Sequence, residues 1–388
     1  MSRRAAIIVL DGLGVGPAPD TDRYGDSGSD TLGNTLRAVG GVSLPNLAAF
    51  GFGNMAPLAG IPAAATPQAA YGRARPVSAG KDSTTGHWEL CGVVLDRPFP
   101  TFPHGFPERV IAEFSRRTGR GVIGNVAGSG TVLLDRYAEE HLRTGAWIVY
   151  TSADSVFQVA AHEAKVPLAE LYAACGIARG MLTGADGVSR VIARPFIGGP
   201  GAWKRTPNRK DLSVVPPEPT LLDHLADAGV PRVGVGKIDD LFAGRNIASV
   251  HTPTNADAYR LIVDALATMR SGFLFVNVIE FDQSWGHRND VPGFVGGLRE
   301  LDAALPAILT PVREDDLIIF TADHGNDPTT ASTDHAREMV PVLAYGPRVR
   351  PVALGERATF ADLGQTVAEF LGARPLRTGT SFLSEVWR

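Results

Sequence analysis

Three aspartates each come directly after an apolar run with the length and composition of a buried strand. Asp11 ends the run Ile-Ile-Val-Leu, Asp282 ends a run that begins at Phe273, and Asp323 ends one that begins at Leu317. Because ligands gather beyond the carboxyl ends of strands in open α/β sheets, we expect the three carboxylates to converge at one edge. Carboxylates that converge repel one another unless cations lie among them, so the pattern predicts a cation-binding centre.

Three histidines lie close in the sequence to two of these aspartates. His287 shortly follows Asp282, His324 directly follows Asp323, and His335 comes a little later. Carboxylate oxygen and neutral imidazole together suit zinc or manganese, whereas calcium and magnesium prefer mostly oxygen ligands. Six ligands suit two cations better than one, and a metal pair can clamp a phosphoryl group. The sequence therefore predicts a dinuclear metal centre and phosphoryl-transfer chemistry.

A run of three hydroxyl side chains is the candidate source of a nucleophile. Ser83, Thr84 and Thr85 lie within the segment Lys-Asp-Ser-Thr-Thr-Gly-His-Trp-Glu. The run precedes a predicted helix, so the same hydroxyls could serve only as helix N-caps. A bound divalent ion lowers the pKa of a water strongly and should act on a hydroxyl in the same sense, without a separate base. Spacing alone does not choose among the three residues.

The elements that must position these residues follow from the hydrophobic pattern. Short runs rich in β-branched residues alternate with segments of helical periodicity, which predicts an α/β fold with a mostly parallel sheet flanked by helices. Strands are expected at 6–10, 147–150, 190–193, 233–235, 273–279 and 317–320. Helices are expected at 168–181 and over the apolar positions from Ala258 to Met269, the latter capped by Thr254 or Asn255.

The chain is long enough for two domains. Proline-rich segments at 97–103 and 215–219 indicate boundaries near residues 100 and 215, with the middle of the chain inserted into the rest. We therefore expect a discontinuous metal-binding catalytic core, residues 1–100 and 215–388, and a smaller inserted α/β cap domain, residues 101–214, that contacts substrate.

Bulk properties exclude several classes of partner. The net charge of −4, without a run of like charges, disfavours nucleic acid and anionic membranes. Apolar runs fall far short of the roughly 20 residues of a membrane span. Cys91 and Cys175 lie among apolar neighbours, which is typical of structural thiols in a reducing compartment. We expect a soluble cytoplasmic protein with no obligatory protein partner.

Longer segments around these residues resemble the phosphopentomutases of the alkaline phosphatase superfamily, which interconvert ribose 1-phosphate and ribose 5-phosphate. The resemblance runs nearly from end to end. Gly-His-Trp-Glu at 86–89 and Arg-Thr-Pro-Asn-Arg at 205–209 are its most specific segments, whereas Asp-His-Gly-Asn at 323–326 is shared with phosphoglycerate mutases. Further matching segments are 11–20, 150–156, 193–196 and 379–382.

The resemblance implies an alkaline-phosphatase-like core with an inserted cap and two manganese ions. It assigns one ion to Asp282, His287 and His335 and the other to Asp11, Asp323 and His324. It also places the nucleophile directly after Lys-Asp, at Ser83, where the family pattern has threonine. Serine keeps the hydroxyl with a freer rotamer, and Thr84 remains a lesser candidate. We expect His87 and Trp88 to shape the nucleophile's loop.

The same resemblance implies where the sugar phosphate is held. Ser152, Asp154 and Val156 match positions that contact the sugar. The non-reacting phosphate would be bound by Arg194, Arg209 and Lys237, the planar guanidinium suiting a phosphate and the lysine adding a point charge.

These features together predict a phosphopentomutase that works through a phosphoenzyme on Ser83 and acts on small sugar phosphates. It would first be phosphorylated by glucose 1,6-bisphosphate or ribose 1,5-bisphosphate as an activator. A metal-dependent phosphatase with the same centre is the main alternative and differs only in the phosphoryl acceptor. A phosphoglycerate-mutase-like enzyme is disfavoured by the segments of the predicted cap. A catalytically inactive sugar-phosphate-binding module is disfavoured by the presence of all six ligands and a hydroxyl.

Overall fold

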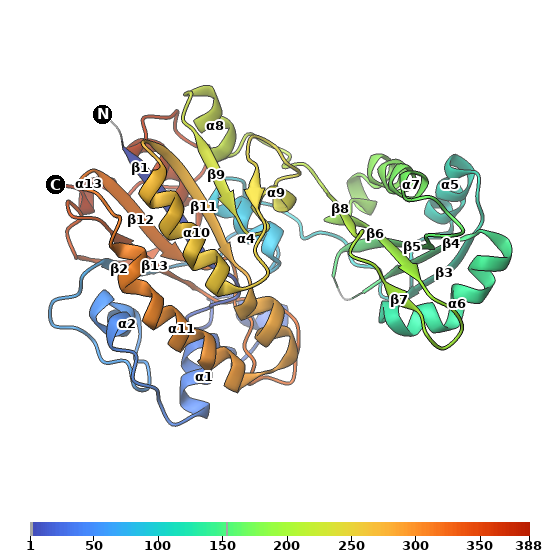
Figure 1. Ribbon diagram of the computed structural model, residues 1–388. Helices are drawn as coiled ribbons and strands as arrows, with labels where there is room; N and C mark the ends of the chain where they lie inside the picture. Colours follow the sequence, from blue (N-terminus) through green and yellow to red (C-terminus); the bar gives the residue numbers. More distant parts are fainter. Residues whose placement is uncertain (1–2, 153) are drawn as a thin grey trace. The chain divides into compact units, whose positions relative to one another are not determined.

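The computed structural model describes residues 3–152 and 154–388, and the chain divides into two compact units (Figure 1). Met1–Pro98 and Pro216–Arg388 together form one unit, which we call the core unit. Phe99–Val215 forms the other, which we call the inserted unit because it interrupts the core unit in the sequence. Ala153, within the motif at 150–156, lies outside the described residues.

The core unit is built on an eight-stranded sheet in the order β10-β9-β11-β1-β12-β13-β2-β14. The first five strands of this order run parallel, and β13 is antiparallel to both of its neighbours. Each strand predicted for this unit is confirmed. The bounds are β1 Arg4–Leu10, β2 Ala70–Ala74, β9 Arg232–Val235, β10 Ser249–Val250, β11 Gly272–Val278, β12 Asp316–Thr321, β13 Val340–Tyr345 and β14 Ala353–Arg357.

Helices cover this sheet. Figure 1 shows α10 and α11 lying side by side across one face, and α4 and α8 both contact α12. The predicted N-cap of α10 is confirmed at Thr254, whose hydroxyl accepts from the Asp257 N–H. The bounds are α1 Thr31–Ala38, α2 Pro45–Phe50, α3 Phe52–Met55, α4 Ser83–Leu90, α8 Leu221–Asp227, α9 Ile238–Leu241, α10 Asn255–Thr268, α11 Val291–Leu309, α12 Ala361–Phe370 and α13 Leu383–Val386.

The central strand β1 is buried along its whole length, which explains its almost uninterrupted apolar sequence. Arg4, at its start, is directly opposite Asp316 of β12 and forms a buried ion pair with it, with Nε 2.9 Å from Oδ1. The same guanidinium donates to the carbonyls of Leu266 and Pro311. These bonds fix the amino ends of β1 and β12 relative to each other. The carboxyl ends of the two strands, which Asp11 and Asp323 follow, are therefore held in register.

The inserted unit has its own six-stranded mixed sheet, in the order β3-β4-β5-β6-β7 with β8 paired to β6. Helices α5 and α7 cover one face with a hydrophobic cluster around Phe114, Trp147 and Phe157, and α6 covers a second cluster around Leu134 and Phe196. The helix predicted at 168–181 is confirmed. The bounds are β3 Val122–Ala127, β4 Trp147–Thr151, β5 Val156–His162, β6 Arg190–Ile197, β7 Lys204–Arg205, β8 Lys210–Ser213, α5 Glu108–Thr118, α6 Gly130–Thr144 and α7 Leu168–Met181.

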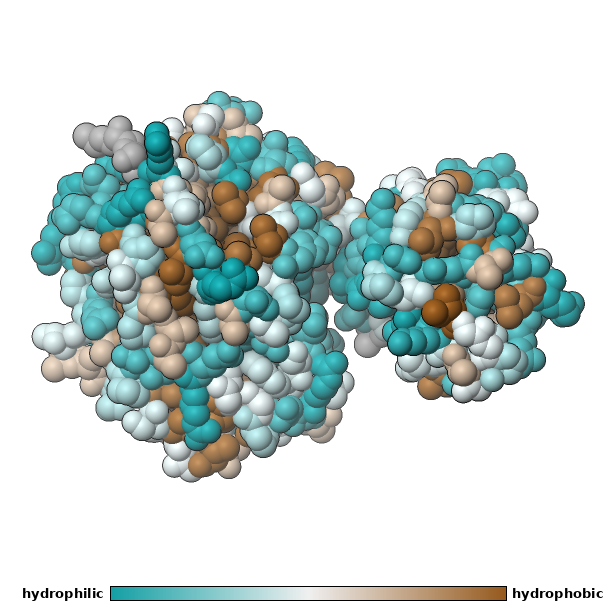
Figure 2. Space-filling model, viewed as in Figure 1, coloured by the Kyte–Doolittle hydropathy of each residue, from teal (hydrophilic) through white to brown (hydrophobic). Residues whose placement is uncertain are grey.

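Large exposed hydrophobic side chains are scattered along the sequence, at Val39, Val77, Val132, Ile197, Val215 and Val250. On the face in view, hydrophobic and hydrophilic residues are interspersed in both units (Figure 2). Across the described ranges 3–152 and 154–388, no helix combines the length and apolar character that crossing a bilayer requires.

Candidate active site

The three aspartates that follow strands meet at the carboxyl edge of the core sheet. Asp11 directly follows β1, and its N–H donates to the Val278 carbonyl of β11 at 3.1 Å. Asp323 comes just after β12, and Asp282 lies in a π-helical turn that follows β11. All three carboxylates are buried. A single π-helical turn often marks a functional site, because it redirects a side chain that an α-helix would place elsewhere.

One ligand cluster joins Asp282 to the two histidines that are further away in the sequence. Ligand atoms of Asp282, His287 and His335 all lie within 4.8 Å of one another. Each histidine places Nε2 3.4 Å from an oxygen of the aspartate. His287 Nδ1 lies 2.7 Å from the Thr333 carbonyl, which orients the ring with Nε2 towards the cluster.

A second cluster surrounds His324. Ligand atoms of Asp11, Asp282 and His324 lie within 4.8 Å of one another. His324 Nε2 is 3.4 Å from both Asp11 Oδ1 and Asp323 Oδ2. Burial would lower the pKa of His324, but Asp323 and the neighbouring carboxylates raise it to about 10. Asp282 therefore borders both clusters, a feature that the resemblance does not imply.

The buried carboxylate oxygens of this site fit a cation. Both Asp11 oxygens and Asp323 Oδ2 are buried, and among the described residues only basic groups approach them. Lys237 Nζ lies 2.7 Å from Asp11 Oδ2, His87 Nδ1 lies 3.1 Å from Asp323 Oδ2, and the His324 ring borders both carboxylates. Burial would raise the pKa of Asp11, but Lys237 holds it below its usual range. Buried anionic oxygens are stabilised by cations, and this set of oxygen and imidazole donors suits a divalent metal.

Ser83 is the first residue of α4, and its hydroxyl faces the second cluster. Its Oγ lies 3.2 Å from His324 Nε2 and 3.3 Å from Lys237 Nζ. Asp82 serves as the N-cap and accepts from the Thr85 N–H at 3.1 Å, while the Thr85 hydroxyl donates to Asp82 at 2.6 Å. Thr85 is thus committed to the cap. Ser83, in contrast, presents its hydroxyl to the charged groups of the site.

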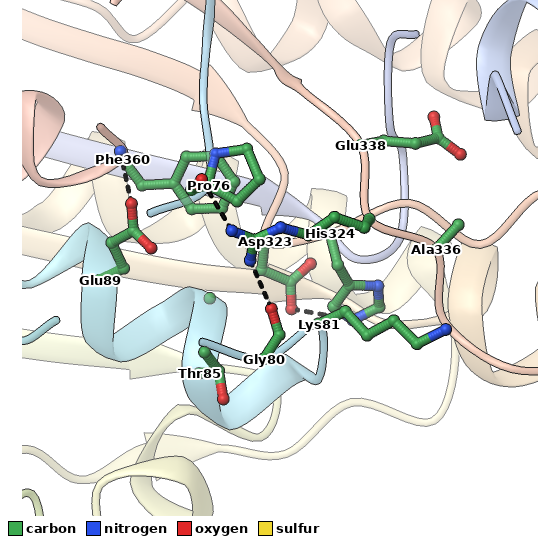
Figure 3. A pocket seen from close by; sticks show the side chains of 12 residues that line it. Pro76, Gly80, Lys81, Thr85, Glu89, Asp323, His324, Ala336, Glu338 and Phe360 are labelled. Atoms are coloured by element: carbon green, nitrogen blue, oxygen red, sulfur yellow. Dashed lines mark hydrogen bonds and ion pairs between the residues drawn. The ribbon is translucent and has the colours of Figure 1, made fainter. Parts of the chain in front are cut away.

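The loop that leads to Ser83 is held by two buried charged residues. Glu89 accepts from the N–H groups of Val77 and Ser78 and from Phe360 N. Arg337 donates to the carbonyls of Pro76, Ser78 and Gly80. Figure 3 shows the small pocket behind α4, with Glu89 directed at Phe360 and with Gly80, Lys81 and His324 on its walls. This bonding fixes the backbone before α4 and so fixes Ser83.

The predicted substrate-binding residues are distributed between the units. Ser152 and Asp154 lie between β4 and β5, and Val156 begins β5. Arg194 lies on β6 and donates to Gln158 at 2.9 Å, and Arg209 makes two 2.6 Å bonds to Asp211. These five predicted residues belong to the inserted unit, whereas Lys237 belongs to the core unit beside Ser83.

Comparison with known proteins identifies the family of this chain. The Metalloenzyme superfamily model matches residues 3–375. The phosphopentomutase of Dictyoglomus thermophilum is 51% identical over 386 residues, covering 99% of this chain and 98% of the relative. That of an Anaeromyxobacter species is 54% identical over 390 residues, covering 100% of both. The chain belongs to the phosphopentomutase family. It is therefore an isomerase of the phosphotransferase type with an alkaline-phosphatase-like α/β core.

Among solved structures, the phosphoglycerate mutase of Leishmania mexicana aligns with 98% of this chain and 97% of its own, at 14% identity and a TM-score of 0.46.

This member of the phosphopentomutase family has residues that support the site, and of these only His87 was given such a role from the sequence. Asn326 donates from Nδ2 to Asp282 Oδ1 at 2.7 Å, and its N–H donates to the Thr31 hydroxyl at 3.0 Å. That hydroxyl donates in turn to buried Glu338 at 2.7 Å. His87 Nδ1 lies 2.9 Å from the Ser83 carbonyl and 3.1 Å from an Asp323 oxygen, linking α4 to a carboxylate of the cluster. Asn326 and His87 lie inside the segments 323–326 and 86–89, which carry the family resemblance. No sequence pattern indicates a role for Thr31 or Glu338.

Proposed function

We propose that this chain interconverts ribose 1-phosphate and ribose 5-phosphate, and their 2-deoxyribose counterparts, through a phosphoenzyme on Ser83. The observation that supports this best is the position of Ser83. Ser83 begins α4, and its hydroxyl lies 3.2 Å from His324 Nε2 and 3.3 Å from Lys237 Nζ. Both of these basic groups are ion-paired with the buried carboxylate of Asp11. Family membership supplies the reaction class, and the geometry favours Ser83 as the phosphoryl carrier over Thr85, whose hydroxyl is bonded to Asp82.

Two divalent cations, manganese by preference, would complete the centre. Asp282, His287 and His335 would hold one, and Asp11, Asp323 and His324 the other. When bound, the metals supply positive charge that lowers the pKa of a nearby hydroxyl and stabilises phosphoryl oxygens. The position of Asp282 beside both clusters supports a shared centre rather than two independent sites.

The chain's own residues account for the transfer. Phosphorylated Ser83 gives its phosphoryl group to the free hydroxyl of the sugar phosphate: the P–O bond to Ser83 breaks, a P–O bond to the sugar forms, and the hydroxyl proton is released. In the second transfer, the other P–O bond to the sugar breaks, a P–O bond to Ser83 forms, and the freed sugar oxygen takes up a proton, which restores the phosphoenzyme. Lys237, 3.3 Å from Ser83 Oγ, is placed to neutralise charge during both transfers. A sugar bisphosphate, glucose 1,6- or ribose 1,5-, would load Ser83 initially.

The inserted unit would act as the cap domain that contacts the substrate, and the core unit carries the proposed catalytic residues. Ser152, Asp154 and Val156 would contact the sugar, and Arg194 and Arg209, with Lys237 of the core unit, would bind the phosphate that does not react. A cap of this kind excludes water, which would otherwise hydrolyse the phosphoenzyme while the intermediate reorients.

The test is intact-mass measurement and peptide mapping after incubation with manganese and glucose 1,6-bisphosphate. We expect one phosphoryl group, on the peptide that contains Ser83, and none on the Ser83→Ala protein. A phosphoryl group on Thr84 or Thr85 would reassign the nucleophile. Release of inorganic phosphate faster than formation of ribose 5-phosphate would instead identify a metal-dependent phosphatase.

A further inference from the structure

His87 lies one turn after Ser83 on α4, and its imidazole ring is buried where this helix meets β11. Its Nδ1 lies 2.9 Å from the Ser83 carbonyl oxygen and 3.1 Å from Asp323 Oδ2. On the other side of the ring, Nε2 lies 3.4 Å from Nδ2 of Asn277. The ring also packs against Phe275, with ring centroids 5.7 Å apart. Both ring nitrogens therefore have polar partners, and one of these partners is a proposed metal ligand.

The partners of His87 determine which of its nitrogens carries the proton. Nδ1 faces a carbonyl oxygen and a carboxylate oxygen, which accept hydrogen bonds, so Nδ1 is the donor. Nε2 faces an amide nitrogen, which donates, so Nε2 is the acceptor. Because the hydrogen bonds of the ring nitrogens fix the position of the proton, His87 is the neutral tautomer that is protonated at Nδ1.

The bond to His87 also accounts for a buried amide in an apolar strand. The sequence of β11 is Gly-Phe-Leu-Phe-Val-Asn-Val, and Asn277 in it is fully buried. Its Oδ1 receives no hydrogen bond from the described residues. Burying an amide costs free energy unless the amide is bonded, so an apolar residue would otherwise suit this position better. Asn277 projects from the same face of β11 as Phe275, and the two side chains hold the ring from one side.

Gly86 brings α4 into contact with the backbone of Asp323. A Cβ at this glycine would overlap the Asp323 carbonyl oxygen. The carboxylate of Asp323 is restrained at both oxygens, because Oδ1 accepts from the Gly12 N–H at 3.1 Å and Oδ2 faces His87. The helix that begins with Ser83 and the segment that carries Asp323 therefore meet twice, through the backbone at Gly86 and through the imidazole.

We propose that His87 is a positioning residue for phosphoryl transfer. Its Nδ1–H donates to the Ser83 carbonyl and presents its partial positive charge to Asp323, so it holds the nucleophile and a proposed metal ligand at a fixed separation. Asn277 supports the ring in this tautomer. The inference rests on the function proposed above and adds residues on which the geometry of that site depends. Replacing a group that orients a metal ligand commonly changes metal affinity or activity by about tenfold to a hundredfold.

The test compares two replacements that keep different nitrogens of the ring. In His87→Asn the amide nitrogen takes the place of Nδ1 and keeps the donor, whereas His87→Gln reaches the place of Nε2 and loses that donor. We expect His87→Gln to lower kcat by about tenfold to a hundredfold, and to weaken Mn²⁺ binding at one of the two sites by a similar factor. KM for ribose 5-phosphate should stay nearly unchanged, because other residues contact the substrate. His87→Asn should keep most of the parental kcat, and His104→Gln, at an exposed histidine, is the control that should change nothing.

A spectroscopic measurement tests the tautomer without turnover. In the metal-free full chain with nitrogen-15-labelled histidine, the signals that disappear in His87→Gln should show a protonated Nδ1 and an unprotonated Nε2. Asn277→Leu removes the donor to Nε2 and leaves the acceptors at Nδ1. This variant should therefore keep the proton on Nδ1 but lower kcat several-fold at unchanged KM, because the ring is no longer held at its far side.

Three results would overturn the proposal. The first is a folded His87→Gln protein with the kcat and the Mn²⁺ affinity of the parent, and the second is a ring protonated at Nε2 alone. The third is an equal loss in His87→Asn and His87→Gln, which would show that the donor at Nδ1 has no part in the effect. If His87→Gln does not fold, Asn277→Leu decides, and parental kcat in that variant would overturn the proposal.

Failure of the proposed function would give a different result. A chain that never isomerises ribose phosphates, but loses Mn²⁺ affinity in His87→Gln, would keep the positioning role and refute the mutase reaction. A chain that isomerises them at the parental rate in His87→Gln would refute the positioning role alone.

Discussion

Ser83 differs by one methyl group from the threonine of the family pattern. Its Oγ is positioned by α4 and by its neighbours His324 and Lys237, not by a second substituent on Cβ. Ser83→Thr should therefore accept the phosphoryl group, with kcat within about tenfold of the parent, because β-branching restricts χ1 without removing the hydroxyl. Phosphopeptide mapping and kcat measure this. A loss as severe as that of Ser83→Ala would show that the site is shaped for serine alone.

Glu338 links protonation to stability. Burial, with smaller contributions from Asp327 and Asp30, raises its pKa to about 8, although two hydrogen bonds from Thr31 act in the opposite sense. An acid with a raised folded-state pKa binds its proton more tightly when folded. The contribution of Glu338 to the free energy of unfolding is therefore most favourable below pH 4.5 and is lost as the pH rises towards 8.

Glu338→Gln should therefore flatten this pH dependence. We expect the variant to gain stability relative to the parent between pH 5 and pH 8, on the order of a few kcal/mol. Urea denaturation of the metal-free proteins at both pH values measures the difference. Glu369→Gln, an exposed carboxylate in the same unit, is the control and should leave the slope unchanged. Equal slopes for parent and Glu338→Gln would contradict the prediction.

The aspartates that follow strands could be predicted from the sequence. The residues that hold the site in place through hydrogen bonds, such as Thr31 and Glu338, could not. Asp11, Asp282 and Asp323 could be found because a carboxylate after an apolar run is a local signal, and parallel strands bring such signals to one edge. Glu338 and Thr31 are 307 positions apart, and their bond exists only because the fold brings their loops together. No spacing rule relates them.

The π-helical turn that carries Asp282 depends on the close packing of Trp285 against two glycines of α11. Gly293 and Gly297 face Trp285, and a Cβ on either would overlap its indole ring. Trp285 also packs against Phe281, with ring centroids 5.4 Å apart. The glycines therefore let Trp285 anchor the turn close to the helix. Asp282 and His287 flank this tryptophan in the sequence, so its position sets theirs.

Gly297→Ala should consequently weaken metal binding at the Asp282–His287–His335 cluster, by about tenfold or more, as is typical when support behind a metal ligand is removed. Gly296→Ala is the matched control, because a Cβ there meets open space on the same helix. Calorimetric titration with Mn²⁺ gives the affinity and stoichiometry for both. Identical titrations for the two variants would show that Trp285 does not hold the turn.

Elements with a clear period were predictable and irregular ones were not. The helix at 168–181 and the buried strands have the spacing or composition that their structure demands. The π-helical turn is a single irregular turn, so no repeating pattern of apolar residues marks it in the sequence. Strands β2, β3, β5, β7, β8, β10, β13 and β14 were also not predicted. In β2 and β14, Ala-Tyr-Gly-Arg-Ala and Ala-Leu-Gly-Glu-Arg lack the β-branched residues that mark a strand.

At the scale of the whole molecule, the inserted unit has what it needs to fold alone. It is continuous in sequence from Phe99 to Val215 and contains two hydrophobic clusters, one on each face of its sheet. A fragment of these residues should unfold cooperatively on heating, as followed by circular dichroism, and should keep the near-ultraviolet signal of buried Trp147. A fragment without a cooperative transition would show that the unit requires the core unit.

The pairing of β1 with strands from late in the sequence also affects when the core sheet can form during synthesis. Strand β1 is made first, yet its two partners in the sheet begin at Gly272 and Asp316. At the usual speed of a ribosome, tens of seconds separate their emergence. During that time the inserted unit can complete its own sheet. The apolar residues of β1, in contrast, cannot yet pair with β11 or β12. The nascent chain therefore carries a strand that is fully buried in the folded protein, exposed for most of translation, and this makes the segment a natural place for a chaperone to bind.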